Sequence, residues 1–332
     1  MCTAINFLNQ KHENVFGRTM DFHHILDPRF VAFPAGAAWE NVLGQICTDR
    51  YGVAGIARYA RNLYVMFDGV NEKGFAGGML YFHGYADFPQ PSQESDKAQI
   101  PALDFLHYAL GSCTSLADLR LLLTESTLVG IRDSLTGTVA PIHWMFTDLS
   151  GESLVVEQTK SGLHVYENPV GVMTNSPDFP WQMTNLRNYM EAAPEQTGEI
   201  DWNGFRMEPF GQANGTSVLP GGYTPPARFV RTVYQKLHMV QPEDIEESVI
   251  GGFHFLEGVT LPNGVVKTAN GMFDYTQYTA MIDLSNQVYY FKTYENPQMI
   301  RVDVKPFWTS ETKGIQDIGS IHVPVFYGAI PK

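Results

Sequence analysis

The residue with the clearest chemical potential is Cys2, which follows Met1 and precedes Thr3 and Ala4. Removal of Met1, which a small second residue permits, gives Cys2 a free α-amine beside its own thiol. An α-amine has a reference pKa of about 7.7–8.0 and a thiol one of about 8.5, so the amine can take the thiol proton near neutral pH. One residue would then supply both nucleophile and base, as in enzymes with an N-terminal nucleophile. The alternative is that many chains simply begin with Met and Cys, so other residues must converge on Cys2.

Arg18 and Asp21, in the string GRTMDFH, are the residues expected beside Cys2. Residues 3–8 and 15–22 have strand-like patterns and are joined by the polar turn 9–14, which predicts a hairpin. Its second strand returns a cation and a carboxylate towards the start of the chain. Positions three apart point to opposite faces of a regular strand, so we predict a bulge or similar irregularity around Thr19 and Met20. Taken singly, each charged residue is more typical of a solvated or salt-bridged surface.

The rest of the chain predicts strands and helices in a single domain, residues 1–332. Alternating apolar segments predict a hairpin over 63–82 and a three-stranded meander over 143–168. Apolar residues spaced three and four apart predict helices within 101–125, 181–190 and 224–239. Strands at both ends and helices between them favour an α+β sandwich, in which two antiparallel sheets pack together and helices cover their outer faces. Residues 191–222 are Gly-rich and lack periodicity, so they are either mobile or a contact to another subunit.

Composition favours a small organic substrate. The net charge of −13 disfavours nucleic acids and anionic membrane surfaces as partners. No segment approaches the length of a membrane span and the first residues lack a secretory pattern, so cytoplasmic residence is expected. Cys47 and Cys113 are interpreted as small semi-buried side chains, because three scattered cysteines suit neither a disulfide framework nor a zinc site. The ten histidines show no metal-ligand spacing, so neither metal nor other cofactor is expected.

Six short strings, in this order along nearly the whole chain, resemble the choloylglycine hydrolases, the family of penicillin V acylases and conjugated bile salt hydrolases. They are MCT at 1–3, GRTMDF at 17–22, DGVNEKG at 68–74, VGVMTNSPDFPWQ at 170–182, LPGGYTPPARFVR at 219–231 and DYTQYT at 274–279. The resemblance implies the fold of the N-terminal-nucleophile hydrolases, a four-layer αββα sandwich. It also implies hydrolysis of a linear amide through a thioester, and a homotetramer with 191–222 as a candidate assembly arm.

The resemblance also implies the catalytic set, which is Cys2, Arg18, Asp21, Tyr81, Asn175 and Arg228. Cys2 would attack the amide carbonyl, and the side chain of Asn175 with the backbone N–H of Tyr81 would donate to the resulting oxyanion. Asp21 would hold the α-ammonium or thiol proton in place. Arg18 and Arg228 would favour the thiolate and balance the carboxylate.

The substrate is predicted largely from one position. Within the resemblance, bile salt hydrolases commonly have Asn where this chain has Tyr81, and penicillin V acylases have Tyr. An aromatic ring there suits a flat aryloxyacetyl group, so penicillin V acylase is the first expectation and conjugated bile salt hydrolase the alternative. A third hypothesis, from another class, is an inactive aromatic-pocket binding protein on the same fold. The residues expected to bind the substrate are Met20, Phe22, Tyr59, Phe82 and Leu135.

Overall fold

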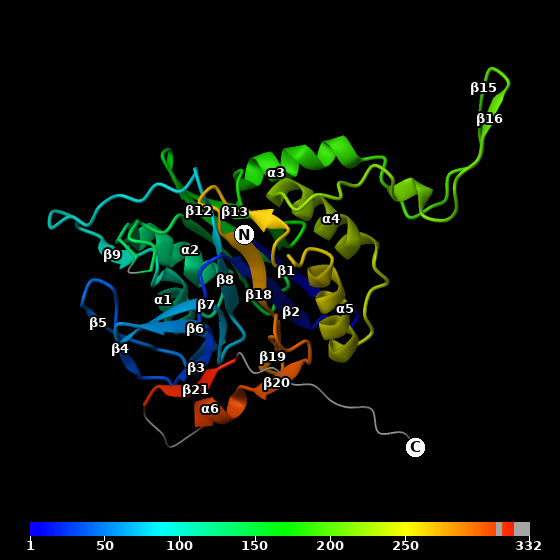
Figure 1. Ribbon diagram of the computed structural model, residues 1–332. Helices are drawn as coiled ribbons and strands as arrows, with labels where there is room; N and C mark the ends of the chain where they lie inside the picture. The colour runs from blue at the N-terminus through cyan, green and yellow to red at the C-terminus, as the bar shows by residue number, and fades with distance from the viewer. Residues whose placement is uncertain (134, 310–313, 322–332) are drawn as a thin grey trace.

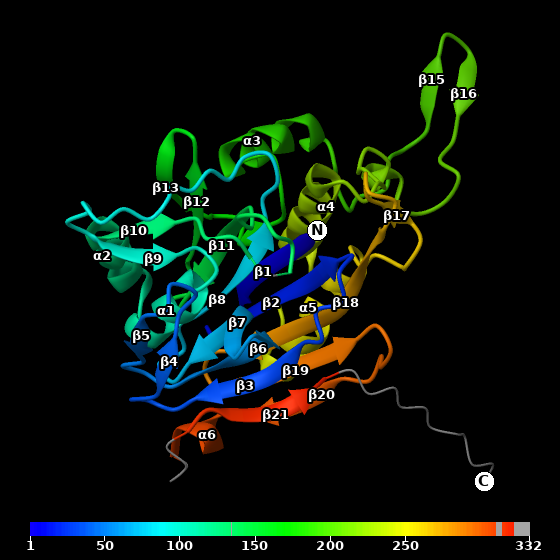
Figure 2. The ribbon, with the colours of Figure 1, turned by 60° about the vertical axis from the view of Figure 1, so that its left-hand side comes forward.

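Two large antiparallel sheets face each other in a computed structural model that describes residues 1–133, 135–309 and 314–321. The first sheet runs in the order β14-β1-β2-β18-β19-β20, with β17 paired to β18. Its strands are β1 (Cys2–Leu8), β2 (Asn14–Phe22), β14 (Val172–Met173), β17 (Val266–Lys267), β18 (Phe273–Asp283), β19 (Val288–Thr293) and β20 (Ile300–Asp303). In Figure 2 the central strands β2 and β18 pass in front of α5, on which they pack.

The second sheet runs in the order β13-β12-β11-β8-β7-β6-β3-β21. Its strands are β3 (Arg29–Phe33), β6 (Val53–Ala60), β7 (Leu63–Asn71), β8 (Ala76–Tyr81), β11 (Ile142–Thr147), β12 (Ser153–Thr159), β13 (Gly162–Glu167) and β21 (Gln316–Ser320). Three small pairs lie outside both sheets, namely β4 (Ala38–Glu40) with β5 (Ile46–Thr48), β9 (Ala98–Pro101) with β10 (Ser126–Val129), and β15 (Ile200–Trp202) with β16 (Phe205–Met207). Strands β1 and β2 are buried along nearly their whole length because the other sheet covers one face and helices cover the other.

Helices form the two outer layers (Figure 1). Helix α1 (Phe105–Ser112) packs on β6, β7 and β8 of the second sheet, and α5 (Ile245–Glu257) packs on β1, β2 and β18 of the first. The other helical segments are α2 (Leu116–Glu125), α3 (Phe179–Asn185), the 3₁₀ turns η1 (Leu186–Tyr189) and η2 (Asn214–Thr216), α4 (Pro225–His238), and α6 (Lys305–Thr309). The predicted αββα sandwich is therefore confirmed. Within the described residues, no helix is both long enough and apolar enough to span a bilayer.

Local signals in the sequence set where the helices begin. Ser115 accepts a hydrogen bond from the backbone N–H of Asp118 at the start of α2, and Thr224 caps α4 in the same way before two prolines. Such caps satisfy N–H groups that have no partner within the helix, and proline suits the first turn because it has no N–H to satisfy. The helix α4 carries Arg228 in that first turn and so delivers it to the start of β1.

The predicted irregularity near Thr19 and Met20 is wrong in its position. Strand β2 is continuous and pairs residue by residue with β1, placing Met20 opposite Cys2. The register instead shifts in β18, where Thr276 pairs with Asp21 and Tyr278 pairs with Met20, leaving Gln277 as an extra residue. No bulge is needed in β2, because Arg18 and Asp21 approach Cys2 from opposite faces of the sheet.

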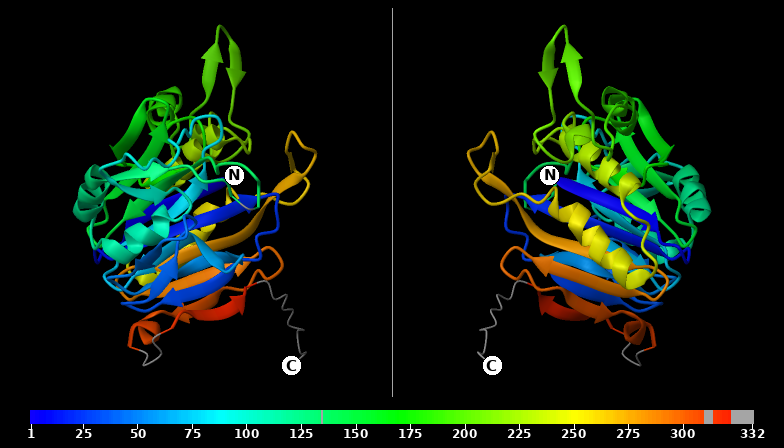
Figure 3. Two further views of the ribbon diagram at one scale, coloured as in Figure 1. Left: turned by 90° about the vertical axis from the view of Figure 1, so that its left-hand side faces the viewer. Right: turned by 90° about the vertical axis from the view of Figure 1, so that its right-hand side faces the viewer.

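The segment 191–222 leaves the body of the protein. Its hairpin, β15 and β16, projects away from both sheets in Figures 1 and 3. Large apolar side chains along it are exposed, including Ile200, Trp202, Phe205 and Phe210. An apolar surface of this kind is unusual on a protein that remains a monomer.

Candidate functional site

Cys2 begins β1, and its side chain points between the two sheets. The residue is only 3% exposed, and its Sγ accepts a hydrogen bond from Arg18 Nη2 at 3.0 Å. The backbone N–H of Cys2 donates to Asn175 Oδ1 at 2.8 Å. Guanidinium and sulfur in direct contact form a charge-assisted hydrogen bond once the thiol ionises, which stabilises the nucleophilic thiolate.

Arg18 is held by the opposite sheet. Its Nη1 donates to the carbonyl of Phe67 at 3.0 Å and lies 3.3 Å from Asp68 Oδ2, with all of these groups buried. Asp68 also accepts hydrogen bonds from the hydroxyls of Tyr278 and Tyr289. Burial raises the pKa of Asp68 to about 6, although the charge of Arg18 opposes that rise. Burial also disfavours the charge on Arg18, but Tyr278, Cys2 and Asp68 outweigh this effect and its pKa is raised.

Asp21 lies on the outer face of the first sheet, away from Arg18. Its carboxylate accepts from Thr276 Oγ1 at 2.6 Å and from Thr19 Oγ1 at 3.2 Å. Its backbone N–H donates to the carbonyl of Met1 at 3.0 Å, so the residue is tied to the chain immediately before Cys2. Burial raises the pKa of Asp21, and the nearby N-terminal ammonium and Arg228 oppose the rise.

Asn175 and Arg228 complete the surroundings of Cys2. Arg228 is fully buried and donates to the carbonyl of Cys2 at 2.5 Å, to Thr3 Oγ1 at 2.6 Å and to Asn175 Oδ1 at 2.6 Å. These bonds fix the amide orientation, with Asn175 Nδ2 donating to the carbonyl of Tyr81 at 2.6 Å. Among the described residues this is the one hydrogen bond from Nδ2, which carries two hydrogens. The second hydrogen is the donor that an oxyanion beside Cys2 would need.

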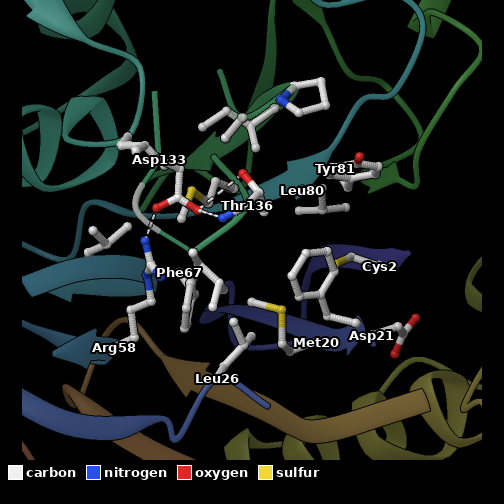
Figure 4. Close-up of a pocket in the computed structure, with 18 of the residues that line it drawn as sticks. Cys2, Met20, Asp21, Leu26, Arg58, Phe67, Leu80, Tyr81, Asp133 and Thr136 are labelled. Atoms are coloured by element: carbon white, nitrogen blue, oxygen red, sulfur yellow. Dashed lines mark hydrogen bonds and ion pairs between the residues drawn. The ribbon is translucent and has the colours of Figure 1, made fainter. Parts of the chain in front are cut away.

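A cavity opens beside Cys2 and runs between the sheets (Figure 4). It encloses about 690 Å³ of empty space, its open mouth included. Most of its wall is apolar, formed by Met20, Phe22, Leu26, Val65, Phe67, Met79, Leu80, Leu103, Leu135, Ala140 and Ile142. A nucleophile at one end of an apolar cavity suits an amide whose acyl group is apolar.

Comparison with known proteins shows the family to which the chain belongs. The family model for linear amide C–N hydrolases of the choloylglycine hydrolase family matches residues 2–307. The chain belongs to the choloylglycine hydrolase family. It is 32% identical over 305 residues to a bile salt hydrolase/transferase from Clostridium perfringens, covering 92% of each chain. It is therefore an enzyme of the class that hydrolyses linear amides.

Solved structures of this family have the same fold. A mutant conjugated bile acid hydrolase from Clostridium perfringens is similar with a TM-score of 0.91 and 29% identity, covering 99% of this chain and 100% of that one. A penicillin V acylase from Agrobacterium tumefaciens is similar with a TM-score of 0.76 and 20% identity, covering 97% and 94%. At 20% identity the likeness to the acylase supports the fold alone, whereas the bile acid hydrolase is also more similar in sequence.

The structure brings together the six residues expected at the catalytic centre, and three of the five expected to bind the substrate line the cavity. Met20, Phe22 and Leu135 line the cavity. Tyr59 does not, because it follows Arg58 on β6 and strand alternation turns it to the other face, where it is half exposed. Phe82 does not either: it is fully buried and stacks on His143, with ring centroids 4.2 Å apart.

A buried pair that the sequence analysis missed supports the turn bearing Asn175. His143 Nε2 lies 2.9 Å from the carbonyl of Thr174, and its Nδ1 lies 3.1 Å from Glu157 Oε1. Glu157 also accepts from the backbone N–H of Phe179, the first residue of α3, at 3.2 Å. The pair therefore fixes both ends of the turn that carries Asn175. No spacing motif marks either residue. The pair could have been found only by aligning the two neighbouring strands of the predicted meander, β11 with His143 and β12 with Glu157.

A second hollow lies on the other side of Tyr81 and Phe22. It is lined by Met1, Phe22, His23, Tyr81, His83, Asn175, Ser176, Pro225, Asp274 and residues 268–270. Several polar side chains, those of His23, His83, Asn175, Ser176 and Asp274, stand in its otherwise mainly apolar wall. Two hollows that share Phe22 and Tyr81 thus lie near Cys2, one for each half of an amide substrate, and the second offers polar side chains to an amine.

The other two cysteines are poor nucleophiles. Cys113 is buried, and burial together with the nearby Asp118 raises the pKa of its thiol to about 12. Burial also raises the pKa of Cys47, and the nearby negative charge of Asp104 raises it further. A thiol that stays protonated at neutral pH does not attack an amide, so the geometry leaves Cys2 as the candidate.

Proposed function

We propose that this protein cleaves the amide of conjugated bile salts. The observation that carries the proposal is the apolar lining of the cavity, which begins at Cys2, reaches Arg58 and Asp133, and suits an apolar acyl group. Relatives about 30% identical over nine-tenths of the chain, including the bile salt hydrolase/transferases of Clostridium perfringens and Lactiplantibacillus plantarum, support it.

In the proposed reaction, Cys2 Sγ attacks the amide carbonyl as a thiolate stabilised by Arg18. The carbonyl oxygen becomes an oxyanion, which accepts from Asn175 Nδ2 and from the backbone N–H of Tyr81. The C–N bond breaks as the amine takes the proton released by the thiol through the α-amine of Cys2. Water then attacks the thioester, releases the acid and restores the thiol.

Penicillin V is the second candidate substrate, and Tyr81 is the observation that favours it. The Tyr81 ring lies at the junction of the two hollows, 6.0 Å from the Phe22 ring between centroids, where a phenoxy group would find aromatic neighbours. The first expectation from sequence rested largely on this residue. The bile salt hypothesis is better supported, because the cavity extends from Tyr81 as far as Arg58 and Asp133, and because the more similar relatives are bile salt hydrolases.

We also propose that the active form lacks Met1. The residue lines the hollow proposed for the amine, and its ammonium nitrogen donates to the carbonyl of Asp21 at 2.5 Å and lies 3.8 Å from Asp274 Oδ2. Removing it would clear that hollow and turn the Cys2 nitrogen, already 2.8 Å from Asn175 Oδ1, into a free amine. Intact mass together with activity tests this: a form that keeps Met1 and turns over at the full rate would refute it.

For assembly we propose a homotetramer held by the arm 191–222. The exposed apolar side chains of its hairpin, among them Trp202 and Phe205, suit burial against another copy of the chain. Light scattering after size-exclusion chromatography should report four copies for the native chain and fewer for Trp202→Ser/Phe205→Ser. A native chain that elutes as a monomer would contradict the proposal.

The function is tested by initial rates on glycine- and taurine-conjugated bile acids and on penicillin V, with Cys2→Ala as the inactive control. A higher kcat/KM on the bile salts supports the proposal, and a preference for penicillin V favours the second candidate. Binding of either compound without turnover by a chain that has lost Met1 would support the inactive binding protein instead.

A further inference from the structure

A buried ion pair closes the cavity at the end remote from Cys2. Figure 4 shows Arg58 and Asp133 on one side of the cavity and Cys2 with Asp21 on the other. Arg58 Nη2 donates to Asp133 Oδ1, and the two side chains are only 8% and 7% exposed. The walls between these polar groups are almost entirely apolar. The cavity therefore has polar groups at both ends and an apolar middle.

The backbone around Arg58 and Asp133 fixes the positions of both residues. Arg58 lies on β6 directly opposite Val65 of β7, so the sheet fixes its position. Asp133 lies in a turn closed by its own backbone, whose N–H donates to the carbonyl of Thr138 and whose carbonyl accepts from Gly137, both at 2.8 Å. The backbone N–H of Thr136 donates to Asp133 Oδ2 at 3.3 Å. Both threonines also line the cavity beside the pair.

Stability does not account for such a pair. Removing two charges from water costs as much as their attraction returns, so apolar residues of similar volume would serve the fold equally well. The pair instead presents donors and an acceptor to the cavity. A guanidinium carries five N–H donors and a carboxylate four acceptor positions, more than the bond between them uses. A hydroxyl, which both donates and accepts, complements this combination, and a keto oxygen can accept from Arg58.

The position of the pair sets the length of the group that reaches it. Strand β7 separates β6 from β8, so Arg58 lies two strand spacings, about 10 Å, across the sheet from the strand that ends at Tyr81. An acyl group must therefore be long and apolar before its polar end meets the pair. An unsubstituted phenoxy ring offers no hydrogen-bonding atom at its far end.

We propose that Arg58 and Asp133 form a subsite for a hydroxyl or keto oxygen at the end of the acyl group remote from the scissile amide. This inference rests on the proposed bile salt hydrolysis and specifies which feature of the acyl group the chain selects. A substrate that lacks the oxygen leaves the buried pair facing apolar atoms, which a site built for a hydroxyl resists. The loss of one hydrogen bond to a charged group corresponds to about tenfold to 100-fold in kcat/KM.

The test compares two glycine conjugates that differ by one group, those of 3-hydroxycholanic acid and of unsubstituted cholanic acid. We expect the chain lacking Met1 to prefer the hydroxylated conjugate by about tenfold to 100-fold in kcat/KM, mainly through KM. In Arg58→Met/Asp133→Leu, which replaces the pair by apolar side chains of similar volume, the ratio should fall towards one. The matched control is Arg29→Met/Asp317→Leu, which removes a partly exposed ion pair between β3 and β21 outside the cavity and should keep the ratio.

The outcomes separate this proposal from the function on which it rests. Equal kcat/KM values for the two conjugates in the native chain overturn the subsite and leave bile salt hydrolysis intact. A preference that persists in the double variant also overturns it. Turnover of penicillin V with neither conjugate cleaved refutes the proposed function itself. Should the double variant fail to fold, Asp133→Asn keeps the shape of the side chain and must still lower the ratio.

Discussion

Replacing Asn175 by aspartate isolates the proposed oxyanion donor. The carboxylate can keep the acceptor role of Oδ1, which lies 2.6 Å from Arg228 Nη2 and 2.8 Å from the backbone nitrogen of Cys2. What disappears is Nδ2, with its bond to the carbonyl of Tyr81 at 2.6 Å and the second hydrogen proposed for the oxyanion. The variant thus changes a donor to an acceptor with almost no change in shape.

The expected effect follows from the worth of one such donor. Removing an oxyanion-hole donor costs about 2.7–4 kcal/mol, or about 100-fold to 1000-fold in kcat. The new carboxylate oxygen also faces the carbonyl of Tyr81 and the developing oxyanion, so kcat for Asn175→Asp should fall by at least about 100-fold. Because the lost interaction strengthens only in the transition state, KM should change much less than kcat.

The assay is steady-state release of the amine from the substrate that the function test selects, with kcat and KM measured separately. Asn168→Asp is the matched control, since Asn168 is also buried and its Nδ2 donates to a backbone carbonyl, that of Val172 at 3.3 Å. It makes no contact with Cys2 and should retain kcat. A kcat within tenfold of the native value for Asn175→Asp, in a folded chain, would refute the role given to Asn175.

Three further changes test other parts of the structure. Cys2→Ala should fold, as judged by circular dichroism, yet lose turnover; residual turnover well above background would point to another nucleophile. Burial raises the pKa of Asp104 from 3.8 to about 6, so the folded state binds its proton more tightly and stability falls as pH rises between these values. Asp104→Asn, which resembles the protonated acid, should therefore raise the free energy of unfolding by about 3 kcal/mol at pH 8 and change it little at pH 3.5, measured by urea denaturation. His143→Leu should lower that free energy by about 3 kcal/mol at pH 7, because the buried Glu157 loses its side-chain partner and keeps only the backbone N–H of Phe179; an unchanged urea midpoint would contradict this.

The sequence predicted the layers and the helices α1 to α4 for reasons that are local, whereas α5, which packs on the first sheet, lies outside the predicted helical ranges. Strands β1 and β2 follow from short apolar runs around a polar turn, and α2 and α4 follow from the capping residues Ser115 and Thr224. The placement of Tyr59 failed because one step along a strand reverses the face, and the pattern did not show which face lines the cavity.

The contacts around Cys2 were harder to predict because they join distant segments. Asp68 meets Tyr278 and Tyr289 across more than 200 residues, and only the packing of the two sheets brings them together. Nothing in local spacing marks such a meeting, although Asp68 stands within one of the strings that carry the family resemblance. The pair of Arg58 and Asp133 was missed for the same reason, since a strand and a separate turn contribute one residue each.

The extra residue in β18 makes the length of that strand matter more than its composition. Thr276 and Tyr278, two positions apart, would share a face in a regular strand, yet one bonds Asp21 on the outer face and the other bonds Asp68 between the sheets. Gln277 makes this possible. Deleting it would restore regular alternation and take one of the two partners away from the surroundings of Cys2, whatever residues replaced it. At this point the protein should accept substitutions more readily than any change in the number of residues.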